Sequence, residues 1–514
     1  MHLRGSSKTT PNCSFCSLGA LALWGLIGVF AGACGTEPET ARGVLLISVD
    51  SLRADHMSSY GYRSATNPKV PTTPVMDRML AAKGVRFTNA YTTTSWTLPS
   101  HMALMTGLPN ELHGVRGLPD RLHPERPYIA EVFQKVGWRT AGFWSGPNLH
   151  PFFGFDRGFE HYEDCSSSKI DDVAVFKPMN EDEFEQTVQM HEDSHEGVTG
   201  PALVAAFDEW FQGVGDDERF FALVHMWDVH YDYNAPPQYD VFDNNYRGPI
   251  DGQGFTELEL KDPYKTKRGR ADLNRLIALY DAEIRFTDVN VGLMLDSLSS
   301  RGRLDDTLVV FLSDHGEEFT EHEALGHKHS LFDETVRIPI IMRLPGVIPA
   351  NSVVDELTSI VDLAPTILEL TGLPVPRQMW GISLVQTFDG SSLPYRILPL
   401  ELSFKPAPEI WRATVDGRIK VNDIPGREKL FREKLFIYNI EEDPLEGQPE
   451  IVLRNSDNAD IHAAQKLWKE LDDAAALLPQ MESKSMPMQL EQDLNDAGYM
   501  GDDPADEPKK ESDK

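Results

Sequence analysis

Four uninterrupted apolar runs alternate with longer helical patterns along this chain. The runs are Val44 to Val49, Phe220 to His225, Leu308 to Leu312 and Ile338 to Met342. A short apolar run bounded by turn residues is typical of a strand that is buried on both faces of a parallel sheet. Helical patterns lie between the runs, and the longest extends from Ala271 to Ser300. Strands that alternate with helices predict an α/β fold with a mostly parallel sheet.

The chain of 514 residues is long enough for a large domain with an appended subdomain. Short β-like pieces and a helical pattern follow residue 401, so we expect a main domain over residues 43–400 and a C-terminal subdomain over residues 401–501. The acidic and polar stretch at residues 163–200 predicts a surface insertion. Residues 502–514 are charged and almost free of large apolar side chains, which predicts a disordered tail.

Residues 1–34 carry the pattern of an export signal. Arg4 and Lys8 precede an apolar stretch from Leu18 to Ala33, which ends in small residues directly before Cys34. This arrangement resembles the lipobox of bacterial lipoproteins, and it implies a lipid-anchored protein of the cell envelope that faces the periplasm or the exterior. An uncleaved membrane anchor or a plain signal peptide is the alternative interpretation.

The charge of the chain excludes one broad class of partner. It has 48 Lys and Arg against 80 Asp and Glu, a formal net charge of −32. Nucleic-acid binding needs a dense basic face, so we expect no nucleic-acid partner. Anionic substrates must be attracted by local cations instead. The sequence indicates no protein partner, and its 4 cysteines are too few for a disulfide framework.

Ionisable side chains follow two of the apolar runs. Asp50 comes directly after the first run, and Asp314 and His315 come soon after the third. Ligands gather at the carboxyl ends of strands in open parallel sheets, so these three side chains are expected to converge. Two carboxylates and an imidazole suit a divalent cation, namely Ca²⁺, Mg²⁺, Mn²⁺ or Zn²⁺. A turn or a helix cap is the structural alternative for each Asp.

The segment from Thr92 to Gly107 is rich in hydroxyl groups and then becomes helical. Pro99 suits the first turn of a helix, so Thr97 is predicted to lie near the helix N-terminus. The positive end of the helix dipole attracts anions there and stabilises a developing alkoxide. Ser95 and Ser100 compete with Thr97 as the nucleophile, and helix capping is the structural alternative.

Several ordered segments together resemble the sulfatase family of the alkaline-phosphatase superfamily, over residues 43–501. They include VLLISVDSLRADHMSSYGY, SWTLPSHMALMTGLPNELHGV, FFALVHMWDVHYDYNAPPQY, LVVFLSDHGEEF and GHKHSLFDETVRIPIIMRLPG. The resemblance implies an alkaline-phosphatase/sulfatase-like α/β sandwich with a central mixed, mostly parallel sheet and a smaller C-terminal β-containing subdomain. It also implies a metal-dependent hydrolase of sulfate esters.

The resemblance implies a role for each candidate site residue. Asp50, Asp314 and His315 correspond to metal ligands, with Thr97 as a further ligand, although Ser51 stands where typical sulfatases have a second Asp. Catalytic roles fall on Thr97, His230 and Lys328, the last two as groups that contact the sulfate or the leaving group. The remaining candidates for substrate contact are His101, His113, His327 and His329.

The nucleophile position departs from the family pattern. Sulfatases carry C-x-P-S-R or S-x-P-S-R, whose first residue is oxidised to formylglycine, whereas this chain has Thr97-Leu98-Pro99-Ser100-His101. Threonine cannot form that aldehyde, so the Thr97 hydroxyl itself is the expected nucleophile. Related phosphodiesterases and phosphoglycerol transferases resembling lipoteichoic-acid synthase use a threonine, which makes phosphodiester hydrolysis or phosphoglycerol transfer an alternative. A non-catalytic binding protein that kept the fold is another.

Overall fold

The computed structural model describes residues 40–166, 174–175, 199–252, 266–403, 410–424, 433–479 and 484–496. The predicted signal at residues 1–34, the predicted tail at residues 502–514 and most of the stretch at residues 163–200 lie outside these residues. The described residues belong to one compact unit. No helix in the described ranges is both long enough and apolar enough to cross a membrane.

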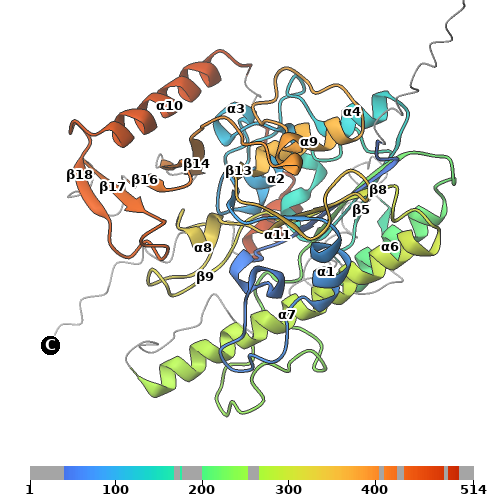
Figure 1. Ribbon diagram of the computed structural model, residues 1–514, viewed down its shortest axis with the longest axis horizontal. Helices are drawn as coiled ribbons and strands as arrows, with labels where there is room; N and C mark the ends of the chain where they lie inside the picture. Colours follow the sequence, from blue (N-terminus) through green and yellow to red (C-terminus); the bar gives the residue numbers. More distant parts are fainter. Residues whose placement is uncertain are drawn as a thin grey trace, which may run out of the picture. The chain divides into compact units, whose positions relative to one another are not determined.

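A mixed nine-stranded sheet forms the centre of this unit (Figure 1). In spatial order its strands are β12 (Ser352–Val354), β2 (Val85–Phe87), β11 (Ile340–Arg343), β8 (Thr307–Ser313), β1 (Gly43–Val49), β7 (Phe220–Met226), β4 (Arg139–Trp144), β5 (His161–Asp164) and β6 (Ala174–Val175). β1 pairs in parallel with both β7 and β8, and Val49 lies opposite Met226 on one side and Ser313 on the other. The carboxyl ends of the three central strands therefore meet at one edge.

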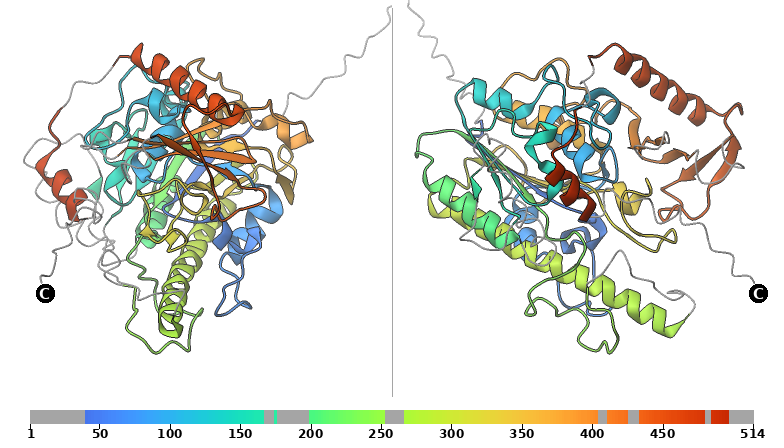
Figure 2. Two further views of the ribbon diagram at one scale, coloured as in Figure 1. Left: turned by 90° about the vertical axis from the view of Figure 1, so that its left-hand side faces the viewer. Right: turned by 180° about the vertical axis from the view of Figure 1, so that it is seen from behind.

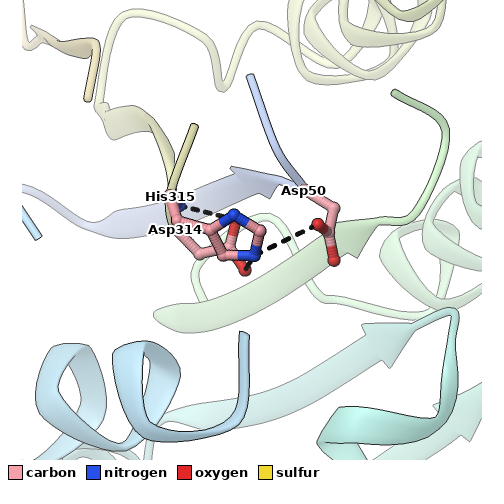
Figure 3. A group of neighbouring side chains, drawn as sticks. All are labelled: Asp50, Asp314 and His315. Atoms are coloured by element: carbon pink, nitrogen blue, oxygen red, sulfur yellow. Dashed lines mark hydrogen bonds and ion pairs between the residues drawn. The ribbon is translucent and has the colours of Figure 1, made fainter. Parts of the chain in front are cut away.

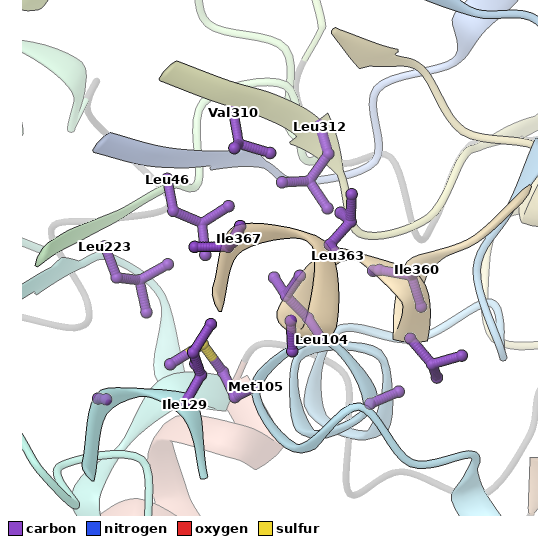
Figure 4. Packing of buried hydrophobic residues seen from close by; sticks show 14 of the residues in the cluster. Leu46, Leu104, Met105, Ile129, Leu223, Val310, Leu312, Ile360, Leu363 and Ile367 are labelled. Carbon is purple, nitrogen blue, oxygen red and sulfur yellow. The ribbon is translucent and has the colours of Figure 1, made fainter. Parts of the chain in front are cut away.

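Helices cover both faces of the sheet. One face carries α1 (Pro74–Met79), α6 (Gly200–Gln212) and α7 (Lys267–Ser300), and the other carries α2 (Thr97–Thr106), α4 (Ile129–Lys135) and α9 (Leu363–Leu370). Successive side chains of a strand point to opposite faces. Val44 and Leu46 accordingly pack with α2, α4 and α9, whereas Leu45, Ile47 and Val49 pack with α1, α6 and α7. Figure 4 shows the first of these cores around Leu46.

Short elements connect these layers. They are β3 (Ala90–Tyr91) paired with β13 (Thr358–Ser359), β9 (Glu318–Phe319) paired with β10 (Leu325–Gly326), and the helices α3 (Asn110–His113) and α8 (Asp333–Val336). Short 3-10 helices span Ala54–His56, Ser58–Tyr60, Ala81–Lys83, Pro147–Leu149, Pro151–Phe153, Ile360–Asp362 and Val385–Asp389. The β9–β10 hairpin follows β8 along the chain.

A second, antiparallel sheet forms the C-terminal part of the unit (Figure 2). Its strands are β14 (Leu398–Ser403), β15 (Ile410–Val415), β16 (Ile419–Asp423), β17 (Lys434–Asn439) and β18 (Glu450–Leu453), and α10 (Ala459–Ala476) packs on it through Trp468. β14 spans the predicted boundary at residues 400 and 401. The last helix, α11 (Met488–Asp496), places Leu490 and Leu494 in the core around α2, α4 and α9.

The predicted fold class is confirmed, and a strand forms at each of the four apolar runs. β11, the strand of the fourth apolar run, begins at Ile340, although the run itself begins at Ile338. Pro339 explains the difference, because proline has no backbone N–H to donate to a neighbouring strand. The predicted helix at residues 271–300 begins four residues earlier, at Lys267, where the side chain of Thr266 caps the first turn by accepting from the Gly269 amide.

Candidate active site

Asp50 and Asp314 follow neighbouring strands at the carboxyl edge of the sheet. Because Val49 lies opposite Ser313, the two aspartates leave β1 and β8 side by side, and both are fully buried. Ser51 connects them: its amide donates to Oδ1 of Asp314 at 3.3 Å, and its hydroxyl donates to Oδ1 of Asp50 at 2.8 Å. Ser51 stands in the left-handed region with a φ of 55°, which turns its amide toward the second strand.

His315 completes a group of three metal-ligating side chains (Figure 3). One ligand atom from each of Asp50, Asp314 and His315 lies within 4.8 Å of the others. Nε2 of His315 is 3.5 Å from Oδ1 of Asp50 and 3.5 Å from Oδ2 of Asp314. Its Nδ1 lies 2.9 Å from the Gly316 carbonyl oxygen, a partner that selects the tautomer with the Nε2 lone pair facing the carboxylates.

The electrostatics of this group fit a divalent cation. Burial, reinforced by the charge of Asp314, raises the pKa of Asp50 to about 8. Burial also raises the pKa of Asp314 to about 8 and lowers the pKa of His315. Within the described part of the chain, Oδ2 of Asp314 is buried without a hydrogen-bond partner. A cation would satisfy this oxygen and offset the repulsion, and Ca²⁺, Mg²⁺, Mn²⁺ and Zn²⁺ all accept such donors.

Thr97 is the first residue of α2 and faces this group. Its hydroxyl donates to Oδ2 of Asp50 at 3.2 Å and lies 3.2 Å from Nε2 of His315. The helix starts here because Trp96 is extended at the N-cap position and Pro99 fits the first turn. The Thr97 side chain is therefore directed to the strand ends, while the backbone of Trp96 occupies the capping position.

The two competing serines bond to backbone carbonyl groups. The hydroxyl of Ser95 donates to the carbonyl oxygen of Ser330 at 2.6 Å. The hydroxyl of Ser100 donates to the carbonyl oxygen of Asp314 at 2.7 Å. Of these three hydroxyl groups, that of Thr97 is the one that contacts the carboxylate and imidazole of the candidate metal site.

Two Glu–His pairs hold the segment that carries Lys328. Nδ1 of His327 is 2.9 Å from Oε1 of Glu317, and Nε2 of His329 is 2.9 Å from Oε2 of Glu318. Both glutamates lie at the start of the β9–β10 hairpin, and both histidines follow its end. Lys328 stands between the two histidines with a φ of 65°. The hairpin therefore fixes the position of Lys328 from both sides.

Lys328 also contacts the segment just before Thr97. Its amide donates to the carbonyl oxygen of Ser95 at 3.0 Å. Its ammonium nitrogen lies 4.3 Å from the centroid of the Trp96 ring, a cation–π contact. The positive charge of Lys328 is thus held beside the start of α2, where an anionic ester would approach Thr97.

His230 joins a row of three histidine rings. Its ring centroid is 4.9 Å from that of His327, which in turn is 4.4 Å from that of His315. His230 stacks on Trp227 at 3.9 Å, and its Nδ1 is 2.6 Å from the carbonyl oxygen of Tyr231. The structure therefore brings His230, His327 and the candidate metal ligands together.

His101 lies within α2, one turn after Thr97. Its Nδ1 is 3.0 Å from the carbonyl oxygen of Thr97, and its Nε2 is 2.9 Å from the hydroxyl of Ser48. The side chain is fully buried, and burial lowers its pKa to about 3. His101 therefore contacts the backbone carbonyl group of Thr97. It stands at the position where typical sulfatases carry Arg.

His113 is the last residue of α3 and is almost fully buried. Its Nε2 is 3.2 Å from the side-chain oxygen of Asn110, and its Nδ1 accepts from the amide of Val115 at 3.1 Å. These contacts stabilise the turn after α3. Substrate contact by His113 therefore stays a prediction.

Two residues of the site were missed by sequence reasoning. His225, the last residue of its apolar run, is fully buried, and its Nε2 lies 3.6 Å from Oδ2 of Asp50. A polar residue at the end of a buried run was the signal for it. Glu317, which bonds His327, is also fully buried, and its place two residues after His315 was the signal for it.

Comparisons with known proteins identify the family of this chain. The family model named Sulfatase matches residues 42–373. The chain is 34% identical over 383 residues to arylsulfatase K of Canis lupus familiaris, covering 69% of this chain and 67% of that relative. It is 25% identical over 358 residues to the ulvan-active sulfatase of Formosa agariphila, covering 68% of this chain and 65% of that relative.

Solved structures show the same fold. A protein solved in complex with its substrate D-glucosamine-2-N,6-O-disulfate has a TM-score of 0.67 to this chain at 18% identity, covering 85% of this chain and 98% of that one. At 18% identity this likeness shows the fold alone. The family is assigned from the family model, which matches more than half of the chain. The chain therefore belongs to the sulfatase family, a family of ester hydrolases, as the ordered segments of its sequence predicted.

Proposed function

We propose that this protein is a metal-dependent hydrolase of sulfate esters in which Thr97 is the nucleophile. The observation that carries the proposal is the position of the Thr97 hydroxyl, 3.2 Å from both Oδ2 of Asp50 and Nε2 of His315. Membership of the sulfatase family supports sulfate esters as the substrate class. The names of two relatives, an ulvan-active sulfatase and an arylsulfatase, support it as well.

Asp50, Asp314 and His315 would hold the cation, with the Thr97 hydroxyl as a further ligand. A bound divalent cation would lower the pKa of the Thr97 hydroxyl and neutralise charge on the ester oxygens. Among the described residues, Oδ2 of Asp314 has no hydrogen-bond partner, which supports this ligand set, because a buried carboxylate oxygen needs a hydrogen-bond donor or a cation.

The chain's own groups then have separate tasks. Oδ2 of Asp50 accepts the hydrogen bond of the Thr97 hydroxyl at 3.2 Å and is placed to receive its proton. The start of α2 directs its positive dipole end at the reacting group. The ammonium group of Lys328 and the ring of His230 lie beside this point and neutralise the equatorial oxygens as charge develops on them.

The Thr97 chemistry sets the second half of the reaction. Attack by Thr97 on sulfur gives a threonine sulfate ester and releases the alcohol. Water must then attack the same sulfur, because threonine offers no hemiacetal through which sulfate could be expelled. Phosphate diesters, whose phosphoryl–threonine ester water can also attack, are for this reason the second substrate class to be tested.

The test compares substrates and Thr97 variants on the metal-loaded protein. We expect the wild-type protein to hydrolyse 4-nitrophenyl sulfate faster than bis(4-nitrophenyl) phosphate. Thr97→Ala should lose activity by about 10³-fold or more while it keeps its bound metal, and Thr97→Ser should keep part of the activity because a hydroxyl remains. A preference for the phosphate diester would assign the second substrate class instead.

Mass spectrometry after a rapid quench identifies the nucleophile directly. A sulfuryl adduct on the peptide that contains Thr97 is the expected result, and it should be missing in Thr97→Ala. An adduct on Ser95 or Ser100 would show that the nucleophile is assigned wrongly. Absence of turnover on both substrate classes, with metal bound, would favour a binding protein that kept the fold.

We also propose that the protein is exported and tethered to the cell envelope by lipid on Cys34. The apolar stretch before Cys34 and its small residues support this proposal. Labelled palmitate should be incorporated into the wild-type chain and lost in Cys34→Ala. Incorporation that survives the substitution would refute lipidation at Cys34, and an unprocessed cytoplasmic chain would refute export.

A further inference from the structure

β18 is the last strand of the C-terminal sheet in spatial order. Within the described part of the chain, it pairs with β17 on one side and with no strand on the other. Figure 1 shows it at the outer end of this sheet. The edge strand of a sheet presents backbone N–H and C=O groups to which another strand can add.

The pairing with β17 decides which backbone groups of β18 face outward. The Arg454 amide donates to the carbonyl oxygen of Glu433 at 2.9 Å, so Arg454 bonds toward β17. Bonded positions alternate along an antiparallel pair, and in this register Val452 bonds toward β17 as well. The N–H and C=O groups of Ile451 and Leu453 therefore point away from β17, toward the outer edge.

A row of apolar side chains accompanies this edge. Successive side chains of a strand alternate between its faces, so Pro449, Ile451 and Leu453 share one face. Ile451 is 50% exposed and Leu453 is 52% exposed. Edge strands that stay in water commonly carry charged side chains instead, lysine above all. A second strand beside β18 would cover this row and remove its apolar surface from water.

One register makes the edge complementary to itself. When two copies of β18 run antiparallel and each Ile451 lies opposite the other, Leu453 of one copy lies opposite Pro449 of the second. Proline has no N–H to donate to Leu453. The Leu453 carbonyl oxygen does not need it, because it already accepts from the Ser456 amide at 3.0 Å and from the Ser456 hydroxyl at 2.6 Å. The missing donor of one copy thus meets a satisfied acceptor of the other.

The remaining outward groups pair fully in this register. The N–H of each Ile451 donates to the carbonyl oxygen of the other Ile451. The N–H of each Leu453 donates to the carbonyl oxygen of Pro449 in the second copy. Every outward N–H of β18 therefore gains an acceptor, although proline interrupts the edge.

The charges beside the axis are compatible with this pairing. Glu450 lies opposite Val452 of the second copy, so its carboxylate meets no like charge directly. The diagonal neighbour of Glu450 is Arg454 of the second copy, and such neighbours are within reach of long side chains. The Arg454 side chain is 32% exposed beside Asp423, so its outer side is accessible to a second carboxylate.

We propose that two copies of this chain associate through β18, in the antiparallel register centred on Ile451, and form one continuous antiparallel sheet. Because the same strand supplies both sides of the contact, the two copies are related by a two-fold axis. One short strand from each copy buries much less than the roughly 1,600 Å² of a standard protein–protein interface. The dimer is therefore weak, with a dissociation constant on the order of 100 µM.

Sedimentation of the purified protein tests the association. Between about 10 µM and about 1 mM, which bracket that constant, the average mass should rise from that of a monomer toward that of a dimer. Ile451→Lys places like charges opposite each other at the axis and should weaken the association by about tenfold or more. A mass that stays at the monomer value in the wild-type protein would overturn the proposal, and β18 would then pair with a different protein or with no strand.

Val353→Lys is the matched control. Val353 is 51% exposed on β12, which is the edge strand of the central sheet, so the same substitution is made at another edge. It should leave the association unchanged. Association that is lost in Val353→Lys and kept in Ile451→Lys would place the contact at β12 and overturn the role of β18. Circular dichroism and urea unfolding of both variants show whether each keeps its fold.

Cross-linking tests the register without a charged substitution. In Ile451→Cys the two Cα atoms at the axis should lie about 5.5 Å apart, within the range of a disulfide. In Glu450→Cys they should lie about 8 Å apart, beyond that range. Mild oxidation should therefore give a covalent dimer from Ile451→Cys, and none from Glu450→Cys or from the wild-type protein, which controls for the native cysteines. A covalent dimer from Glu450→Cys and not from Ile451→Cys would overturn the register.

Discussion

Ser100 donates its hydroxyl hydrogen to the carbonyl oxygen of Asp314 at 2.7 Å, which ties the first turn of α2 to the end of β8. The hydroxyl of Thr92 lies 2.8 Å from the same Ser100 oxygen. Thr97, three residues before Ser100, is held against the strand ends by this bond. Ser100 therefore acts on the site through the backbone, which separates its role from that of Thr97.

Ser100→Ala should destabilise the protein more than it impairs the chemistry. The carbonyl group of Asp314 and the hydroxyl of Thr92 lose a buried partner, which should lower the free energy of unfolding by about 1–3 kcal/mol. We expect activity to fall by roughly tenfold or less, since the nucleophile and its contacts remain. Urea unfolding and kcat on 4-nitrophenyl sulfate measure the two effects. A loss of activity as complete as in Thr97→Ala would contradict this division of roles.

Asp314→Asn should affect the metal-free and metal-loaded proteins in opposite directions. The pKa of Asp314 is raised to about 8 by burial, so its charge opposes folding as pH rises from its unfolded value of about 3.9. Removing that charge should raise the unfolding temperature of the protein in a chelator at neutral pH. Added Mn²⁺ or Ca²⁺ should stabilise the wild-type protein, by about 2.7 kcal/mol at a hundred times Kd.

The same cations should stabilise Asp314→Asn much less, because one charged ligand is lost. The double variant Asp50→Asn, Asp314→Asn should show no shift in unfolding temperature with either cation. An unchanged metal-dependent shift in the double variant would place the metal elsewhere. Elemental analysis of the purified proteins provides the independent check.

The positions of the two aspartates could be predicted, because each of them follows a short apolar run that is recognisable as a buried strand. Each of Asp50 and Asp314 follows an apolar run, and parallel strands bring such positions to one edge. The helix start at Thr97 was likewise encoded by Pro99 within the next two residues. These predictions needed only short stretches of sequence.

Glu317 and His225 could not be predicted in the same way. The hydrogen bond between Glu317 and His327 forms because the β9–β10 hairpin brings together two residues that are ten positions apart. Glutamate and histidine are common residues, so their presence in the sequence does not predict this contact. His225 faces Asp50 only because β7 pairs beside β1 in the observed strand order. The return of α11 to the main core through Leu490 and Leu494 depends on packing in the same manner.

The His322–Glu334 pair should make stability depend on pH. Burial by itself lowers the pKa of His322, but the 2.6 Å hydrogen bond and the charge of Glu334 outweigh it and raise the pKa above its ordinary value. A raised folded-state pKa means that the pair stabilises fully below the ordinary histidine pKa of about 6.5, and that this contribution is lost as pH rises through the folded value.

We expect His322→Gln to lower the free energy of unfolding by about 1–2 kcal/mol more at about pH 6 than at about pH 9. Stacking of His322 on Phe332, with ring centroids 3.6 Å apart, adds a loss that does not depend on pH. The exposed His462 is the control, and His462→Gln should change little at either pH. A difference between wild type and His322→Gln that grows with pH would contradict the sign. Urea titrations at the two pH values measure it.

Substitution of Lys420, in the C-terminal sheet, should strongly lower the free energy of unfolding. Lys420 is fully buried in β16, with its ammonium nitrogen 2.9 Å from Asp333 in α8 and 3.0 Å from Glu446. Lys420→Met leaves two buried carboxylates without their cation, so the free energy of unfolding should fall by about 3–5 kcal/mol. Lys469→Met is the matched control, because Lys469 pairs with Asp473 at 2.6 Å on the surface, and its loss should change the free energy of unfolding very little. Equal midpoints of urea unfolding for the two variants would show that burial adds nothing to the Lys420 pairs.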